Sequence, residues 1–402
     1  MTLTLLLDLD DTLLSNSMDI FVPKYLQALT AHMAAYAPPD LFASKLLAAT
    51  GAMSANDRPD QSLKGTFDAA FYAAVGLDYT TSQAPLMQFY DEVFPILAEY
   101  TGFRSKAVEL VQAAHERGYR LVIATNPLFP QKAVHHRLAW AGLPVEEYDF
   151  ALVSTYEHFH YAKPNPAYFA EILAQIGWPE DPVVMIGNDA NDDIAAARSL
   201  GLATFWIANG ATVENCTAEN PPSGCGELED VLAWLDAHAE EELAPQFETP
   251  AALTALLKST PAALDTLAAS LTPEQYNAQP IPQHWSLTEV FCHLRDVEIE
   301  VNLPRLRKVT EADNALIEGQ NIEHWAKERG YAKQNGPQAL HDYIQARIQT
   351  LDFLNTLEEA DWQRAARHTI FSRISIQDLA TFTARHDRLH IRQAHKVLGA
   401  MA

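Results

Sequence analysis

The sequence is poor in cysteine and lacks both a long apolar run and a secretion signal. Of its 402 residues three are cysteines: Cys216 and Cys225 flank a segment rich in proline and glycine, and Cys292 stands alone. A zinc pair needs further ligands nearby, so we expect free thiols. No apolar stretch approaches the roughly 18 residues of a membrane-spanning helix, and the N-terminus carries neither a basic region nor a cleavage site. We therefore expect a soluble, cytoplasmic protein with no membrane partner.

Basic residues are also scarce. There are 28 Lys and Arg against 52 Asp and Glu, which gives a formal net charge of -24. Because binding to nucleic acid depends on clustered basic side chains, we exclude that partner too. An anionic substrate would have to be held by locally placed cations and a metal. With 402 residues the chain exceeds what one core usually holds, so two or three domains are expected, and association with further copies stays open.

The first part of the chain, residues 1–238, predicts an α/β domain. The apolar run at 3–7 is typical of a strand covered on both faces of a parallel sheet. Residues 16–100 instead carry several helical patterns, so we interpret them as a helical cap inserted into a core of residues 1–15 and 101–238. Helices and strands then alternate, which predicts a doubly wound, Rossmann-like parallel sheet. The alternating segments are 105–117, 119–124, 131–140, 150–154, 166–176, 183–186, 191–200, 203–207 and 227–238.

The second part, residues 250–402, predicts an all-α domain. It follows a charged linker at 239–249 that carries no apolar period, and no strand pattern comes after it. Ser286 with Glu289 three residues later forms a capping box that marks a helix start, and a weaker pair precedes the last helix. Four long segments of helical periodicity predict a four-helix bundle. They are residues 249–270, 286–310, 336–357 and 375–398.

Three acidic residues, Asp8, Asp10 and Asp11, follow the first strand directly. In open α/β sheets the carboxyl edge of the strands is where ligands bind. Because side chains on a strand repeat every two residues, Asp8 and Asp10 would point into the same crevice. Two convergent carboxylates there indicate a magnesium ion and phosphoryl chemistry. The alternative is an acidic turn whose side chains only cap backbone groups.

Three further stretches fall where a phosphate site would need them. Thr125 and Asn126 end a second buried strand and can hold phosphate oxygens, although such a turn is more often structural. Lys163 precedes a helix, where it could neutralise an incoming phosphate, although an isolated surface lysine is the usual case. Asp189 and Asp193 start a helix after a strand and a glycine turn, where acids often serve only as caps. Beside the first pair they would instead complete an oxygen site for magnesium.

Together these stretches resemble the four ordered motifs of the haloacid dehalogenase-like (HAD) hydrolases. The matching motifs are Asp8-Leu9-Asp10-Asp11-Thr12-Leu13, Thr125-Asn126, Lys163-Pro164 and Gly187-Asn188-Asp189-Ala190-Asn191-Asp192-Asp193. The resemblance implies a type-1 cap that selects the substrate, Asp8 as the nucleophile, and Asp10 as the general acid and base. It also implies a phosphate site of Asp8, Thr125, Asn126 and Lys163.

The same resemblance implies a magnesium site made by Asp8, the Asp10 backbone carbonyl and the fourth motif. One departure matters, because the residue after the glycine is usually Asp and here is Asn188. The ligands of the fourth motif therefore stay open among Asn188, Asp189 and Asp193.

The acid at Asp10 separates two reactions of this family. Its dehalogenases lack this acid because a halide leaves without a proton, whereas an alkoxide needs one. The sequence therefore favours a magnesium-dependent phosphatase that acts on a small phosphorylated metabolite through an aspartyl-phosphate. A phosphomutase keeps the same residues and stays an alternative.

Three histidines of the second part form a pattern that suits a metal. His386 and His390 are four residues apart, on one face of an expected helix, and His293 lies on another. Together they could bind a divalent transition metal such as zinc, nickel or iron and leave positions open for water or substrate. The alternative is that they pair with acids such as Asp387 or Glu298 on a solvated face.

The surroundings of these histidines, residues 283–298 and 386–393, resemble the DinB-like family. Its members are four-helix bundles with such a triad and include thiol-dependent transferases and isomerases. The resemblance implies a metal more strongly than it implies a reaction. A thiol-dependent transferase, with the main activity in this domain, is therefore an alternative function of the chain.

Overall fold

The computed structural model describes residues 2–208 and 221–401, and this part of the chain forms two compact units. The first unit holds most residues up to Gln246, and the second holds the residues from Phe247 onward together with the short segments 58–60 and 173–178. The limits of the linker at 239–249 stay a prediction. Within that segment the structure has a short helix, α10 (Glu240–Leu243), and Leu243 is buried in the core of the first unit. A segment that carries no apolar period thus contains an apolar residue, Leu243, with a packing role.

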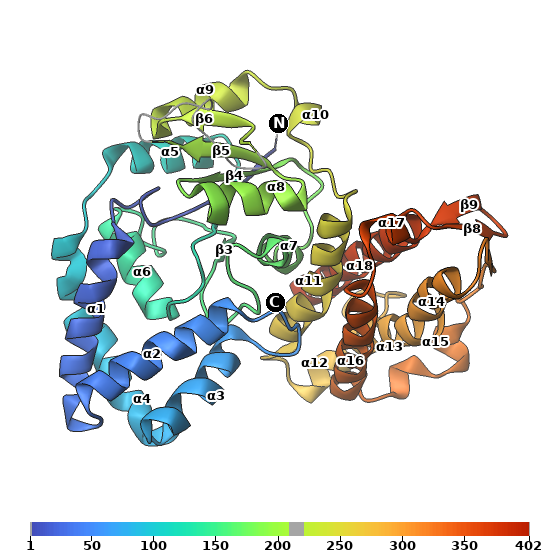
Figure 1. Cartoon of the computed structure of the whole chain (residues 1–402), viewed down its shortest axis with the longest axis horizontal. Coiled ribbons are helices and arrows are strands. Elements are labelled where there is room, and N and C mark those ends of the chain that lie inside the picture. The colour runs from blue at the N-terminus through green and yellow to red at the C-terminus, as the bar shows by residue number, and fades with distance from the viewer. Residues whose placement is uncertain (1, 209–220, 402) are drawn as a thin grey trace. The chain divides into compact units, whose positions relative to one another are not determined.

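The first unit is built on a six-stranded parallel sheet with the order β3-β2-β1-β4-β5-β6 (Figure 1). Leu7 of β1 lies opposite Ile123 of β2 and Ile186 of β4, so these three strands end at the same level. The residues that follow them therefore meet at one edge, where the strand order changes direction. The strands are β1 (Thr4–Leu7), β2 (Arg120–Ile123), β3 (Leu152–Val153), β4 (Val183–Gly187), β5 (Ala203–Ile207) and β6 (Gly224–Gly226).

Helices connect the strands as the alternation predicted, and the doubly wound α/β sheet is confirmed. Among the described strands of this sheet, β6 alone lies outside the predicted strands, because three residues, two of them glycine, show no strand periodicity. The connecting helices are α5 (Ser105–Glu116), α6 (Gln131–Trp140), α7 (Pro166–Gln175) and α8 (Ala196–Leu200), and α9 (Val231–Asp236) follows β6.

The insertion between β1 and α5 is helical, as predicted, and is blue in Figure 1. Local signals set the ends of its helices. Ser62 caps α3 by accepting a hydrogen bond from the backbone N–H of Gly65, and Gly76 ends the same helix in the left-handed conformation (φ 79°). The helices pack through their own apolar core, which is rich in Phe and Tyr. They are α1 (Met18–His32), α2 (Pro39–Ser54), α3 (Leu63–Val75) and α4 (Tyr79–Gln88).

Four long helices dominate the second unit, as predicted. Ser286 and Ser375 each accept a hydrogen bond from the third backbone N–H of the helix that follows, so both capping signals are confirmed. A π-helical segment, Glu298–Asn302, joins α13 to α14. The long helices are α11 (Pro250–Ala268), α13 (Leu287–Val297), α16 (Gly336–Leu354) and α18 (Ile376–Gly399), beside α14 (Leu303–Glu311) and the short α12 (Pro273–Asn277), α15 (Trp325–Glu328) and α17 (Glu359–Trp362).

The helical domain of the second unit is confirmed, but the expectation that it has no further strands is wrong. It contains a sheet of three short strands in the order β7-β8-β9: β7 (Leu316–Ile317), β8 (Ala365–His368) and β9 (Ser372–Ser375). These strands lack the apolar runs that marked the strands of the first sheet, since β8 and β9 carry Arg367, His368 and Arg373. β8 and β9 pair as an antiparallel hairpin, and β7 joins β8 from a distant part of the chain.

The structure bears on two expectations from the composition, the absence of a membrane-spanning helix and the free thiols. No helix within residues 2–208 and 221–401 is long and apolar enough to cross a membrane. Cys292 is a buried thiol, whereas Cys216 lies outside the described residues.

Candidate active site and metal centre

The carboxyl edge of the sheet holds a cavity of about 340 Å³. Asp8 follows β1, Thr125 follows β2 and Asn188 follows β4, so the register of these strands brings the three side chains together. All residues predicted for this site line the one cavity, although their chemical roles stay predictions. They are Asp8, Asp10, Thr125, Asn126, Lys163, Asn188, Asp189 and Asp193.

A buried ion network joins Lys163 to two carboxylates. Its Nζ atom lies 2.8 Å from an oxygen of Asp8 and 2.5 Å from an oxygen of Asp193. Burial, and next the repulsion from Asp193, raise the pKa of Asp8 against the opposing attraction of Lys163. The positive charge of one lysine therefore does not balance the negative charges of both carboxylates. A further positive charge at this place would favour the ionised, nucleophilic form of Asp8.

Asp10 is held by three protein groups. The Asn16 amide donates to one carboxylate oxygen at 2.7 Å, and the Arg137 guanidinium donates to the other at 2.6 Å. The Thr125 hydroxyl lies 3.5 Å from that second oxygen. These contacts fix the orientation of the carboxylate at the cavity.

Arg137 is the main residue of this site that sequence reasoning missed. Its side chain is fully buried, and the guanidinium lies 4.5 Å from the ring centroid of Phe129. Arg137 is the charged member of the otherwise apolar buried face of α6. A lone charge on such a face is a signal that could have identified it, because a buried charge requires a partner.

The loop after β4 supplies three side chains that are used differently. Asp193 is fully engaged, because one oxygen accepts from Lys163 and the other from the backbone N–H of Asp189. One oxygen of Asp189 accepts from two backbone N–H groups and so caps the helical segment that follows. The amide oxygen of Asn188 accepts a hydrogen bond from the hydroxyl of Thr12 at 3.1 Å.

The described lining of this cavity carries far more negative than positive charge. Lys163 is its single cation, whereas seven aspartates line it, two of which, Asp19 and Asp192, the sequence did not single out. A phosphate dianion would be repelled there without a cation to balance the charge. Carboxylate, amide and carbonyl oxygens are the ligands that magnesium prefers, so the donor set fits this ion. The aspartates are Asp8, Asp10, Asp11, Asp19, Asp189, Asp192 and Asp193.

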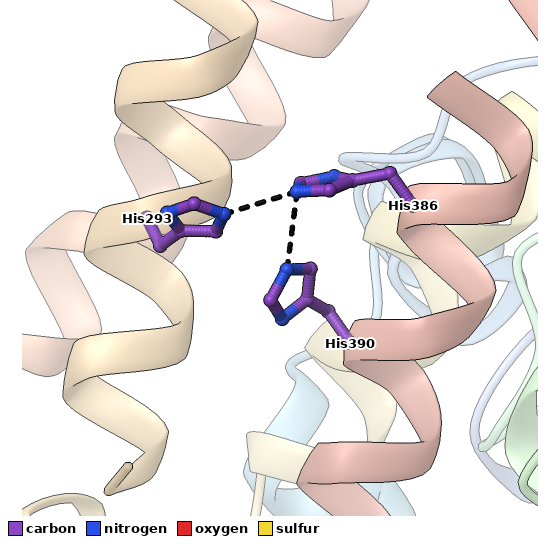
Figure 2. A group of neighbouring side chains, drawn as sticks. All are labelled: His293, His386 and His390. Atoms are coloured by element: carbon purple, nitrogen blue, oxygen red, sulfur yellow. Dashed lines mark hydrogen bonds between the residues drawn. The ribbon is translucent and has the colours of Figure 1, made fainter. Parts of the chain in front are cut away.

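Three histidine rings face one another in the second unit (Figure 2). His293 comes from α13, and His386 and His390 come from α18. The Nε2 atoms of His293 and His390 lie 3.0 Å and 3.1 Å from the Nε2 atom of His386. Three ring nitrogens that converge in this way can all direct lone pairs at one cation. The structure thus brings the three predicted ligands together.

The surroundings of the triad keep its rings neutral and oriented. The Nδ1–H of His390 donates to the side-chain oxygen of Gln393 at 2.9 Å, which leaves Nε2 free to bind a metal. Trp285 stacks on His390 with an interplanar angle of 4°. Burial, and next the charge of His390, lower the pKa of His293 to about 3, and burial lowers that of His390 to about 4. Neutral imidazole is the form that binds metals.

The two acids that were alternative partners of the histidines form ion pairs with an arginine instead. Glu298 and Asp387 both bind the guanidinium of Arg347, at 2.8 Å and 2.5 Å. All three side chains are buried, and the three histidines of the triad face one another. The alternative of histidine–acid pairs on a solvated face is therefore wrong.

A cavity of about 180 Å³ adjoins the triad. His386 lines it together with Arg305 and mostly apolar side chains. A small ligand or water can therefore reach one side of the triad. That access is typical of catalytic metal sites, whereas structural sites are closed by protein ligands.

Comparison with known proteins finds two families along the chain. Residues 2–201 match the family model of haloacid dehalogenase-like hydrolases, and residues 256–394 match that of the DinB superfamily. The two matches lie in the two parts of the chain where the sequence motifs indicated them.

Curated proteins resemble parts of the chain at modest identity. The uncharacterized protein YuaE of Bacillus subtilis (strain 168) is 25% identical over 140 residues, which cover 32% of this chain and 85% of that protein. The phosphoserine phosphatase of Thermus thermophilus is 27% identical over 127 residues, or 32% of this chain and 49% of that enzyme. The glyceraldehyde 3-phosphate phosphatase of Methanothermobacter thermautotrophicus is 25% identical over 122 residues, or 30% and 50%. The chain spans about half the length of both phosphatases.

Proposed function

The chain joins a haloacid dehalogenase-like hydrolase domain to a DinB-superfamily domain, and on that premise we propose that the first domain is a magnesium-dependent phosphatase of small phosphomonoesters. The observation that carries this proposal is the buried Asp8, held by Lys163 in a cavity that it shares with Asp10 and Thr125. The similarity to two phosphatases supports the same reaction class.

In the proposed reaction an oxygen of Asp8 attacks the phosphorus of the ester. The bond from phosphorus to the ester oxygen breaks, and Asp10 in its protonated form gives its proton to that oxygen, which leaves as an alcohol. The Asp10 carboxylate then takes a proton from a water molecule whose oxygen attacks the phosphorus of the aspartyl-phosphate. Inorganic phosphate leaves, and the Asp8 carboxylate and the Asp10 acid are restored. Thr125 and Asn126 hold phosphate oxygens throughout.

Magnesium would be held by Asp8, the backbone carbonyl of Asp10, Asn188 and Asp189. Asp193 is the weaker candidate, because both of its oxygens already accept hydrogen bonds. When bound, the ion supplies the positive charge that Lys163 alone does not supply beside the aspartates. Asp193 then acts by positioning Lys163.

Replacing Asp8 tests the proposal. Asp8→Asn keeps the size of the side chain and removes the nucleophilic charge, so turnover of phosphomonoesters with magnesium should fall by several orders of magnitude while the protein stays folded. The matched control is Asp181→Asn, because Asp181 precedes β4 at the opposite edge of the same sheet. Equal phosphatase activity in wild type and Asp8→Asn would reject the assignment.

We propose further that the second domain binds one divalent transition metal through His293, His386 and His390. The observation that favours a reactive rather than a structural metal is the cavity that reaches His386. This access keeps a metal-dependent transfer reaction in the second domain as the second candidate function of the chain.

A further inference from the structure

The helical insertion of the first unit contains a second cavity, of about 190 Å³. Successive turns of α1 and α2 line it, together with side chains of α3 and α4. Met18, Leu128 and Phe129 line both this cavity and the acidic cavity that holds Asp8. The two cavities are therefore neighbours within the first unit.

The second cavity, which we call the cap cavity, differs sharply in chemistry from the acidic one. Its described lining contains no Asp, Glu, Lys, Arg or His. Most of its side chains are Leu, Met, Phe and Tyr, and they come from the apolar core of the insertion. An ionised group on a ligand would find no partner there.

Five of the six polar side chains that line the cap cavity already form hydrogen bonds within the protein. The hydroxyls of Tyr25 and Tyr90 share a hydrogen bond of 2.9 Å, and Gln83 donates to the hydroxyl of Tyr72 at 2.8 Å. The hydroxyl of Thr50 donates to a backbone oxygen of its own helix at 2.9 Å. A ligand rich in hydroxyl groups would therefore leave those groups unpaired, which costs affinity.

We propose that the cap cavity binds the leaving group of the substrate, and that the substrate is a phosphomonoester of an apolar alcohol. The alcohol carries an aromatic ring or a hydrocarbon chain of roughly six carbons, since an apolar cavity of about 150 Å³ holds a benzene molecule. The phosphate occupies the acidic cavity, and the ester oxygen lies near Asp10. This inference rests on the proposed phosphatase function and names its substrate class.

The first test compares esters under identical conditions with magnesium. The kcat/KM of hexyl phosphate and phenyl phosphate should exceed that of glycerol 3-phosphate at least tenfold. Along a series of alkyl phosphates it should rise by about fourfold per methylene until the cavity is filled, the value expected for burying a methylene. Equal kcat/KM for hexyl and glycerol esters in an active phosphatase would overturn the inference and leave the proposed function standing.

The second test fills the cap cavity. Thr50→Phe places a ring in it and should lower the ratio of kcat/KM for hexyl phosphate to that for glycerol 3-phosphate at least tenfold. Thr30→Phe is the matched control, because Thr30 also donates to a backbone oxygen one turn earlier in its helix but does not line the cavity. An unchanged ratio in a folded Thr50→Phe protein would also overturn the inference.

Binding of hexan-1-ol separates this inference from the proposed function, because the alcohol has no phosphate. Calorimetry on the full chain should show saturable binding in wild type and Thr30→Phe that is at least tenfold weaker in Thr50→Phe. If this pattern appears while no phosphomonoester is hydrolysed, the apolar ligand class stands and the phosphatase assignment fails. If hexan-1-ol does not bind to wild type, the cap cavity is not a ligand site.

Discussion

In the acidic cavity of the first unit seven aspartates face one lysine across the described lining, whereas the centre of the second unit holds three histidines whose rings are neutral. Burial acts in opposite directions at the two places, because it raises the pKa of Asp8 and lowers the pKa of His293. In both cases burial disfavours the charged form of the side chain. A neutral histidine is ready to bind a cation, whereas Asp8 binds one in its ionised form.

The two sites therefore attract different ions. Oxygen donors with excess negative charge suit magnesium, which interacts mainly through charge. Neutral nitrogen donors at converging positions suit a transition metal. The two sites also share one feature, because a fully buried arginine forms an ion pair at each. Arg137 binds Asp10 in the first unit, and Arg347 binds Asp387, which is next to His386 in the sequence.

The largest expected effect is the loss of phosphatase activity when Lys163 is replaced, and it should leave the metal site of the second unit unchanged. Lys163→Met leaves Asp8 and Asp193 without their cation, so kcat/KM for phosphomonoesters should fall about 100- to 1,000-fold. The content of transition metal, measured by elemental analysis, should equal that of wild type. Lys106→Met is the control, because Lys106 forms an exposed ion pair. Loss of transition metal in Lys163→Met would show that the sites are not separate.

Replacing two histidines tests the metal site of the second unit. Wild-type protein purified without an affinity tag should contain close to one equivalent of divalent transition metal. The double variant His386→Ala, His390→Ala should lose most of it, because one nitrogen ligand cannot hold the ion. Magnesium-dependent phosphatase activity should stay unchanged. Equal metal content in both proteins would reject the triad.

Shortening the chain tests whether the first unit folds and is active without the second unit. A chain that ends at Gln246 should fold and keep its phosphatase activity, because it retains α10 and the packing of Leu243. A chain that ends at Glu241 loses Leu243, and its free energy of unfolding should be lower by about 2–5 kcal/mol, the range for losing a buried leucine. Urea unfolding measures the difference, and Leu243→Ala in the full chain is the control. An inactive but folded chain ending at Gln246 would make the second unit part of the catalytic unit.

The smallest effect is a pH dependence of stability in the metal-free protein. The folded-state pKa values of His293 and His390, about 3 and about 4, lie below the ordinary histidine value. The unfolded chain therefore binds protons first, and the stability from neutral histidines is complete above pH ~6.5 and is lost as the pH falls toward ~4. The free energy of unfolding should fall by at most about 1.4 kcal/mol per pH unit for each histidine.

The double histidine variant is the reference for this measurement, because it keeps every other titrating group. The difference in unfolding free energy between wild type and variant should shrink as the pH falls. A difference that stays constant from pH 7 to pH 4 would mean that the histidines are not buried as neutral rings.

Much of the architecture follows from local patterns. Asp8, Thr125 and Asn188 each end a buried apolar strand, and parallel pairing alone then places them at one edge. His386 and His390 share a helix face because they are four residues apart. The strands β7 to β9 could not be predicted in this way, because segments such as Ala365–His368 and Ser372–Ser375 are not apolar runs.

The sequence by itself determined the order of the elements, the acids at the strand ends and the residue types of both sites, because periodicity and motif spacing are local properties of the chain. Only the tertiary structure decided that Arg137 is a partner of Asp10, that both oxygens of Asp193 accept hydrogen bonds, and that the described lining of the cap cavity carries no charge. Each of these depends on which side chains meet across long stretches of sequence. Contacts between residues far apart in sequence depend on how the whole core packs, and local sequence patterns do not contain that information.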